Sequence, residues 1–169
     1  NSELVKNELY EYYKVPKSRI RVIENGIDIE SFHPVSASKK EACKKKLSLD
    51  PNSPVILFVG SGFQRKGAFE LVEAIKLLPK FQAIIVGQDK KIQKLKGLAG
   101  EHNIIITGPQ DNIQKYLDAS DIFCLPSLYD SLPNAALEAL CCGLPVVLTK
   151  DVGLAPHIKK NSAGIICKK

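Results

Sequence analysis

Short apolar runs of strand length recur along the chain, and this repetition limits its fold more than any other feature. They cover residues 20–23, 55–59, 83–86, 104–107, 122–125, 146–148 and 165–167. Most are apolar at every position, which is typical of strands buried on both faces. Segments with helical periodicity lie between most of these runs. In residues 68–78, for example, Val72 and Ile75 share one helix face. The alternation predicts an α/β fold, a Rossmann-like doubly wound parallel sheet.

The first 53 residues are less regular, and four prolines interrupt or directly follow them, Pro16, Pro34, Pro51 and Pro54. We expect a helix over residues 4–13, the strand over residues 20–23, and then a lysine-rich helix. At the other end of the chain, Gly143 follows an apolar helix, which is the usual position for a glycine that ends one. The chain does not begin with Met and stops just after an apolar run. We therefore expect residues 1–169 to be one domain of a larger protein.

The composition and the absence of long apolar runs indicate the type of protein and its compartment. Apolar residues make up 44% of the chain, which suits a globular domain with its own core. No apolar run approaches the roughly 18 residues of a membrane helix, and there is no secretion signal. We therefore expect a cytoplasmic protein with reduced cysteines. These are Cys43, Cys124, Cys141, Cys142 and Cys167. The three histidines, His33, His102 and His157, lie apart, and we assign them no catalytic role.

The formal charge is +6, and much of the positive charge lies in two lysine-rich segments, residues 39–46 and 90–96. Two interpretations stay open. The lysines either form solvated helix faces or attract an anionic partner, such as a phosphorylated glycolipid or the inner face of the cytoplasmic membrane. Nucleic acid is disfavoured because no recognised nucleic-acid-binding motif accompanies the charge.

The loop after residues 55–59 combines glycines with two cations. Gly60, Ser61 and Gly62 permit a tight turn, and Arg65 and Lys66 stand just before the next predicted helix. Ligands of such sheets bind at the carboxyl ends of strands, and this combination suits a diphosphate. A dinucleotide fingerprint would need glycine in place of Arg65, and the spacing of a Walker A motif is absent. The alternative is an ordinary loop with surface cations.

The loop after residues 122–125 carries a candidate carboxylate, Asp130, and a second one, Glu138, is expected about two turns into the following helix, facing the same ligand. We expect Ser131 to cap the following helix, which would leave the amides of Asn134 and Ala135 free for phosphate oxygens. The alternative is that Asp130 is a turn residue and Glu138 an exposed helical one.

Three motifs in this order resemble the C-terminal domain of retaining glycosyltransferases of family four, which have the GT-B fold. They are the Asn-Gly-Ile-Asp signature at residues 25–28, the phosphate loop at residues 57–67, and Asp130 to Glu138 at the family's E-x₇-E motif. The resemblance covers the whole chain. Within the family, residues 58–67 and 86–90 look most like a lipopolysaccharide core glucosyltransferase.

The resemblance implies transfer of a hexose, with retention, from a nucleotide diphosphate sugar to a cell-envelope glycan such as lipopolysaccharide core. UDP-glucose and UDP-galactose are the favoured donors. Asp130, Arg65 and Lys66 would act in catalysis, with the two cations on the diphosphate and Asp130 on the sugar. Glu138 would bind the ribose. The family usually has glutamate where this chain has Asp130, which leaves the donor sugar open.

Further donor contacts follow from the resemblance, in the loops after the strands. They involve Gly60, Ser61, Gly62, Gln88, Pro109, Leu132, Asn134 and Ala135. No cofactor or metal is expected, because GT-B enzymes usually need no bound metal and the chain has no Asp-x-Asp pair. An N-terminal domain outside this chain would bind the acceptor. Two alternatives are a GT-B nucleotide-sugar epimerase and a non-catalytic nucleotide-binding module.

Overall fold

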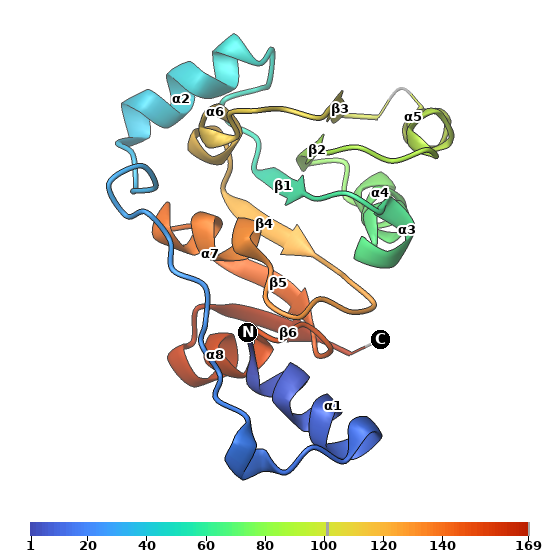
Figure 1. Ribbon diagram of the computed structural model, residues 1–169. Helices are drawn as coiled ribbons and strands as arrows, with labels where there is room; N and C mark the ends of the chain where they lie inside the picture. The colour runs from blue at the N-terminus through green and yellow to red at the C-terminus, as the bar shows by residue number, and fades with distance from the viewer. Residues whose placement is uncertain (101, 169) are drawn as a thin grey trace.

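Six parallel strands form one sheet in the order β3-β2-β1-β4-β5-β6 in the computed structural model, which describes residues 1–100 and 102–168 (Figure 1). The strands are β1 (Val55–Val59), β2 (Gln82–Val86), β3 (Ile104–Gly108), β4 (Ile122–Leu125), β5 (Val146–Thr149) and β6 (Gly164–Cys167). The order reverses between β1 and β4, so the loops after these two strands open on the same crevice. The predicted Rossmann-like doubly wound sheet is confirmed, as are six of the seven predicted strands.

Helices connect the strands and cover the sheet (Figure 1). They are α1 (Glu3–Tyr13), η1 (Lys17–Arg19), α2 (Ala37–Lys46), α3 (Phe63–Lys66), α4 (Ala68–Lys76), α5 (Ile92–Ala99), α6 (Gln114–Asp118), α7 (Asn134–Cys141) and α8 (Ala155–Asn161). The N-terminal helix and the lysine-rich helix are confirmed. The helix predicted over residues 68–78 ends two residues early, at Lys76, and Leu78 is 40% exposed. Each of the five cysteines is free, as predicted.

The strand predicted at residues 20–23 is wrong. This segment belongs to no sheet of the described residues, and the side chain of Ile23 is 73% exposed. The next residue, Glu24, pairs with His157 on α8, with 3.0 Å between Oε1 and Nε2. The segment therefore runs beside a helix, which offers no backbone hydrogen bonds for a strand, so local apolar character is not enough to make one.

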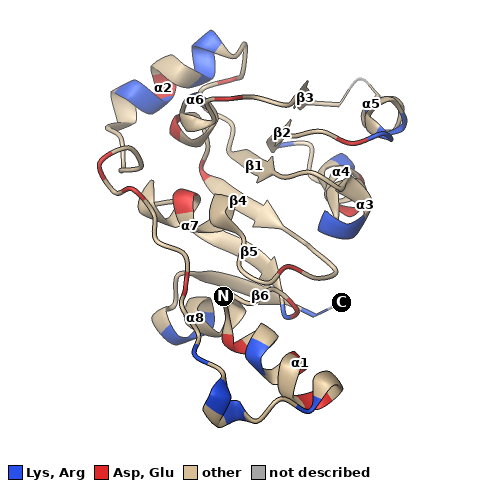
Figure 2. Ribbon diagram, viewed as in Figure 1, with Lys and Arg blue, Asp and Glu red and all other residues tan. Residues whose placement is uncertain are grey.

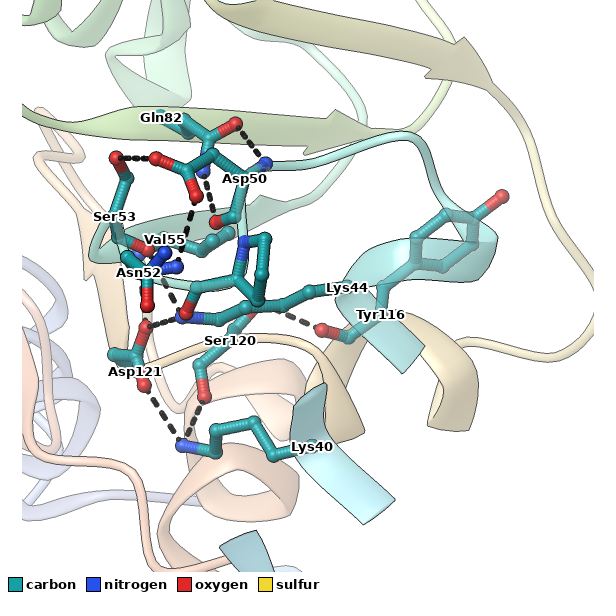
Figure 3. A network of polar contacts seen from close by, with 11 residues as sticks. Lys40, Lys44, Asp50, Asn52, Ser53, Val55, Gln82, Tyr116, Ser120 and Asp121 are labelled. Carbon is teal, nitrogen blue, oxygen red and sulfur yellow. Dashed lines mark hydrogen bonds and ion pairs between the residues drawn. The ribbon is translucent and has the colours of Figure 1, made fainter. Parts of the chain in front are cut away.

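A polar network fastens the start of the sheet (Figure 3). The carboxylate of Asp121 accepts hydrogen bonds from Nζ of Lys40 at 3.0 Å, from Nζ of Lys44 at 2.7 Å and from the amide of Val55 at 2.9 Å. Although burial opposes the charge, the bond from Lys44 and the others lower the pKa of Asp121. Because Asp121 precedes β4 and Val55 begins β1, the network holds α2 against the amino ends of the central strands.

Basic residues are prominent on both α2 and α5 (Figure 2). On α2, Lys40 and Lys44 bind Asp121, and Lys39 lies 3.1 Å from the carboxylate of Asp118. Lys40 and Lys44 therefore hold α2 in place, whereas the side chains of Lys39 and Lys45 are more than half exposed to solvent. In α5, Lys94 lies over the ring of Phe69 at 5.9 Å.

Candidate functional site

The loop after β1 makes two tight turns around the short helix α3. Gly62 (φ 75°) precedes α3, and Gly67 (φ 80°) separates it from α4; both have the left-handed conformation that favours glycine. Arg65 and Lys66 therefore lie inside a one-turn helix of their own, and not on an extended approach to α4. This extra turn, which the sequence analysis missed, sets the direction of both cations.

The side chain of Lys66 folds back over the loop that carries it. A β-carbon built on Gly60 would lie 2.6 Å from Cδ of Lys66, so only glycine leaves room for the lysine in this position. In the loop after the neighbouring strand β2, Asp89 accepts a hydrogen bond from the amide of Phe63 at 2.8 Å and ties this loop to α3. Gln88 is exposed beside it.

The loops after β1 and β4 meet through the three residues predicted for catalysis. Nζ of Lys66 lies 3.1 Å from Oδ2 of Asp130, and both side chains are mostly buried, at 18% and 12% exposure. Nη1 of Arg65 donates to the carbonyl oxygen of Tyr129 at 2.7 Å. The amide of Leu128 in turn donates to the carbonyl of Arg65 at 2.8 Å. The structure thus brings Arg65, Lys66 and Asp130 together at the crevice.

The start of α7 differs from the prediction in its cap. Pro133 occupies the N-cap position, and no side chain caps the helix, so the expected capping by Ser131 is wrong. Ser131 stands two residues too early to reach the amides of the first turn. In the described part of the chain, the amides of Asn134 and Ala135 have no hydrogen-bond acceptor. Nδ2 of Asn25 donates to Oδ1 of Asn134 at 2.6 Å, which brings the Asn-Gly-Ile-Asp segment to this helix start.

Glu138 faces an open hollow of about 610 Å³. Its walls come from the turn after the Asn-Gly-Ile-Asp segment, from the loop between β3 and α6, and from the first residue of α6: Ser31, Phe32, Asp111, Asn112, Ile113 and Gln114. The carboxylate is half-buried, and within residues 1–100 and 102–168 its side chain has neither a hydrogen bond nor an ion pair. Burial raises the pKa of Glu138. A half-buried carboxylate without a donor is suited to receive hydroxyl groups of a ligand.

The turn beside this hollow is built by Asp28. Its carboxylate accepts hydrogen bonds from the amides of Glu30 and Ser31 and from the hydroxyl of Ser31. The bond from the Ser31 hydroxyl and the two amides lower the pKa of Asp28. Asp28 is therefore a turn residue that places Ser31 and Phe32 at the hollow.

The predicted site residues lie in two groups. The phosphate loop, Asp130 and the free amides of α7 form the first, and Glu138 with its hollow forms the second. Pro109 is exposed and does not line the hollow, whereas the residues just after it do. Sequence reasoning missed Ser31, Phe32 and residues 111–114, because polar and apolar loop residues without a motif carry no recognisable signal.

Comparison with known proteins identifies the family. The sequence profile described as "Glycosyl transferases group 1" matches residues 39–169. The chain belongs to this family. A curated relative from Escherichia coli, UDP-Gal:alpha-D-GlcNAc-diphosphoundecaprenol alpha-1,3-galactosyltransferase, is 32% identical over 98% of the chain and 44% of the relative. The chain spans less than half the length of the curated relatives it matches.

Several solved structures share the fold of this chain. One is WaaG, a glycosyltransferase involved in lipopolysaccharide biosynthesis, with TM-score 0.82 and 24% identity over 96% of this chain and 46% of WaaG. Another is HepE from Anabaena in complex with UDP-glucose, with TM-score 0.86 and 22% identity over 99% of this chain and 48% of HepE. The chain corresponds to about one half of these GT-B structures.

Proposed function

We propose that this chain is the C-terminal, nucleotide-sugar-binding domain of a retaining hexosyltransferase that uses a UDP-sugar donor. The observation that carries the proposal is the half-buried Glu138, which lies on α7 at a hollow, eight residues after Asp130, and has no hydrogen-bond or ion-pair partner among the described residues. A carboxylate there provides acceptors for ribose hydroxyls, and the hollow provides volume for the base. UDP is favoured over other nucleotides because a relative and a structural neighbour carry UDP-sugars in their names.

The diphosphate would lie between the cations and the free amides of α7. Arg65 keeps guanidinium donors beyond the one that binds Tyr129, and Lys66 can exchange its bond with Asp130 for phosphate oxygens. Asp130 would then be free to accept a hydroxyl group of the donor sugar. The unpartnered amides of Asn134 and Ala135 add two neutral donors at a helix N-terminus.

This arrangement supports catalysis by stabilising the leaving group. As the bond between the anomeric carbon and the diphosphate oxygen breaks, negative charge builds on that oxygen, and Arg65, Lys66 and the amides of α7 stabilise it. The anomeric carbon acquires oxocarbenium character, and the acceptor oxygen bonds to it on the same face. The acceptor's hydroxyl proton passes to the departing phosphate. Retention of configuration is part of the proposal.

The proposed acceptor site lies outside this chain. We infer that a cell-envelope glycolipid at the inner face of the cytoplasmic membrane is bound by an N-terminal domain, and that this chain alone binds the donor without turnover. No helix of residues 1–100 and 102–168 has the length and apolar character to span a bilayer.

Calorimetric titration of the chain with UDP, GDP, ADP, UDP-glucose and UDP-galactose, without divalent metal, tests the proposal. Tighter binding of UDP than of the other nucleotides, with a further gain from one sugar, is the expected result. Equal, weak binding of all five compounds would contradict it and favour the non-catalytic alternative. An epimerase would be distinguished by interconversion of UDP-sugar epimers without an acceptor.

A further inference from the structure

One connection reaches the site from outside the region that the family profile matches. The hydroxyl of Tyr129 donates to Oε2 of Glu8 at 2.7 Å, although the two residues stand 121 positions apart. Glu8 lies on α1, and the family match begins only at residue 39. Burial, followed by the hydrogen bond to Glu8, raises the pKa of Tyr129 to about 12, so the phenol keeps its proton at neutral pH.

Tyr129 lies in the loop after β4, where it contacts Arg65 and directly precedes Asp130, two of the candidate catalytic residues. Its carbonyl oxygen accepts hydrogen bonds from Nη1 of Arg65 at 2.7 Å and from the hydroxyl of Ser127 at 2.9 Å. The next residue is Asp130, which pairs with Lys66. A shift of the Tyr129 backbone would therefore move an acceptor of Arg65 and the carboxylate of Asp130 at the same time.

A second contact joins α1 to this loop. None of its eleven helical residues is buried, but the residue that caps it, Ser2, is only 1% exposed. Ser2 packs on Gly153, where an added β-carbon would lie 2.8 Å from the serine hydroxyl. The amide of Gly153 donates to the carbonyl of Asp130 at 2.8 Å. The helix thus meets the Asp130 loop twice, through Ser2 and through Glu8.

From this geometry we infer that Glu8 is a positioning residue for the donor site: its hydrogen bond to Tyr129 orients the loop that carries Asp130 and anchors Arg65. The inference rests on the proposed function, because it assigns Arg65 and Asp130 to the diphosphate and the sugar. Glu8 itself touches no reacting group. Its effect passes through one phenol, so it depends on a hydrogen-bond acceptor at position 8 and not on the negative charge.

Three substitutions test the inference through UDP-glucose binding. Tyr129→Phe and Glu8→Ala each remove the bond and should weaken UDP-glucose binding by about two- to tenfold. Glu8→Gln keeps an acceptor oxygen and should restore affinity to within about twofold of wild type. Because both deletions remove the same bond, the double variant should bind no more weakly than the weaker single variant. UDP binding should change less than UDP-glucose binding, since Asp130 is assigned to the sugar.

Matched controls are available on the same helix. Glu11→Ala and Tyr12→Phe alter exposed side chains and should bind UDP-glucose as wild type does. The inference is overturned if Tyr129→Phe and Glu8→Ala bind as wild type, if their effects add in the double variant, or if Glu11→Ala weakens binding as much.

Failure of the proposed function would be recognised separately, as a wild-type chain that binds no nucleotide. Amide hydrogen exchange then decides the role of Glu8. The amides of Leu128 and Asp130 are bonded to the carbonyls of Arg65 and Asp151. Faster exchange of both amides in Glu8→Ala and Tyr129→Phe, but not in Glu11→Ala, would support the inference, and unchanged exchange would overturn it.

Discussion

The ammonium group of Lys66 lies 3.1 Å from the carboxylate of Asp130, so two residues from different strand loops neutralise each other at the mouth of the crevice. A donor diphosphate would compete for the same ammonium group. The ion pair therefore links nucleotide binding to the release of a carboxylate for the sugar, and the first prediction follows from it.

Replacing Asp130 with Asn removes the ion pair while keeping the shape of the side chain. We expect UDP to bind as tightly as to wild type or several-fold more tightly, because Lys66 no longer has to leave a carboxylate. The additional affinity that the sugar provides should fall, since an amide accepts a hydroxyl less well than a carboxylate does. Titration with UDP and the preferred UDP-sugar measures both effects, and an unchanged ratio of the two affinities would contradict the role of Asp130.

Substituting Arg65 and Lys66 together with Ala should abolish most of the phosphate contribution. Loss of two charge-assisted contacts corresponds to about 3 to 6 kcal/mol, or a weakening of UDP binding by at least about 100-fold. Uridine provides the control because it has no phosphate, and its weak binding should be unchanged. Equal losses for UDP and uridine would indicate a folding defect instead.

The raised pKa of Glu138 predicts a pH dependence of donor binding. Because burial disfavours the charged form, Glu138 takes up its proton at a higher pH than an ordinary glutamate, and a protonated carboxyl accepts ribose hydroxyls less well. UDP-glucose affinity should therefore fall as the solution is acidified toward this pKa. Glu138→Gln should bind more weakly at neutral pH and show little of this dependence. UDP-glucose is the appropriate ligand, because its diphosphate has no terminal phosphate that titrates near neutrality.

Asp121 stabilises the amino ends of the central strands β1 and β4, away from the candidate site. Asp121→Asn should lower the free energy of unfolding by about 1 to 3 kcal/mol at neutral pH, because Lys44 is buried and loses its charged partner. The pKa of Asp121 is lower in the folded state, so this stabilisation is present above the unfolded pKa and is lost as pH falls below about 4. Urea unfolding at neutral and acidic pH measures it. Glu41→Gln, at an exposed ion pair with Lys45, should leave stability nearly unchanged, because solvent screens that pair.

Two glycines form a matched pair for testing the phosphate-loop turn. Gly67→Ala places a methyl group 2.2 Å from the carbonyl oxygen of Pro126 at a residue with φ 80°, and should destabilise the chain by more than about 2 kcal/mol. Gly97 lies within α5, and a methyl group there meets no atom within 4 Å. Gly97→Ala should therefore raise stability by about 0.5 to 1 kcal/mol. Thermal unfolding of both variants checks the contrast.

Prediction from the sequence was wrong where the structure of a segment depends on the neighbouring elements. Residues 20–23 have the composition of a strand, but they run beside α8 and find no strand to pair with. Ser131 is a good capping residue, yet α7 begins only at Asn134 because Pro133 and the loop before it delay the helical conformation. Both errors arise because local propensity does not specify the neighbouring element.

The sequence by itself determined the alternation of strands and helices, the parallel sheet, and the segments after β1 and β4 that carry Arg65, Lys66, Asp130 and Glu138, because periodicity and turn residues are local properties. Only the tertiary structure decided that Lys66 pairs with Asp130, that the lysines of α2 fasten the sheet, and that Glu8 reaches Tyr129. These contacts join residues between 64 and 121 positions apart. Such distant pairs are set by the crossovers and packing of the whole domain, which no short stretch of sequence contains.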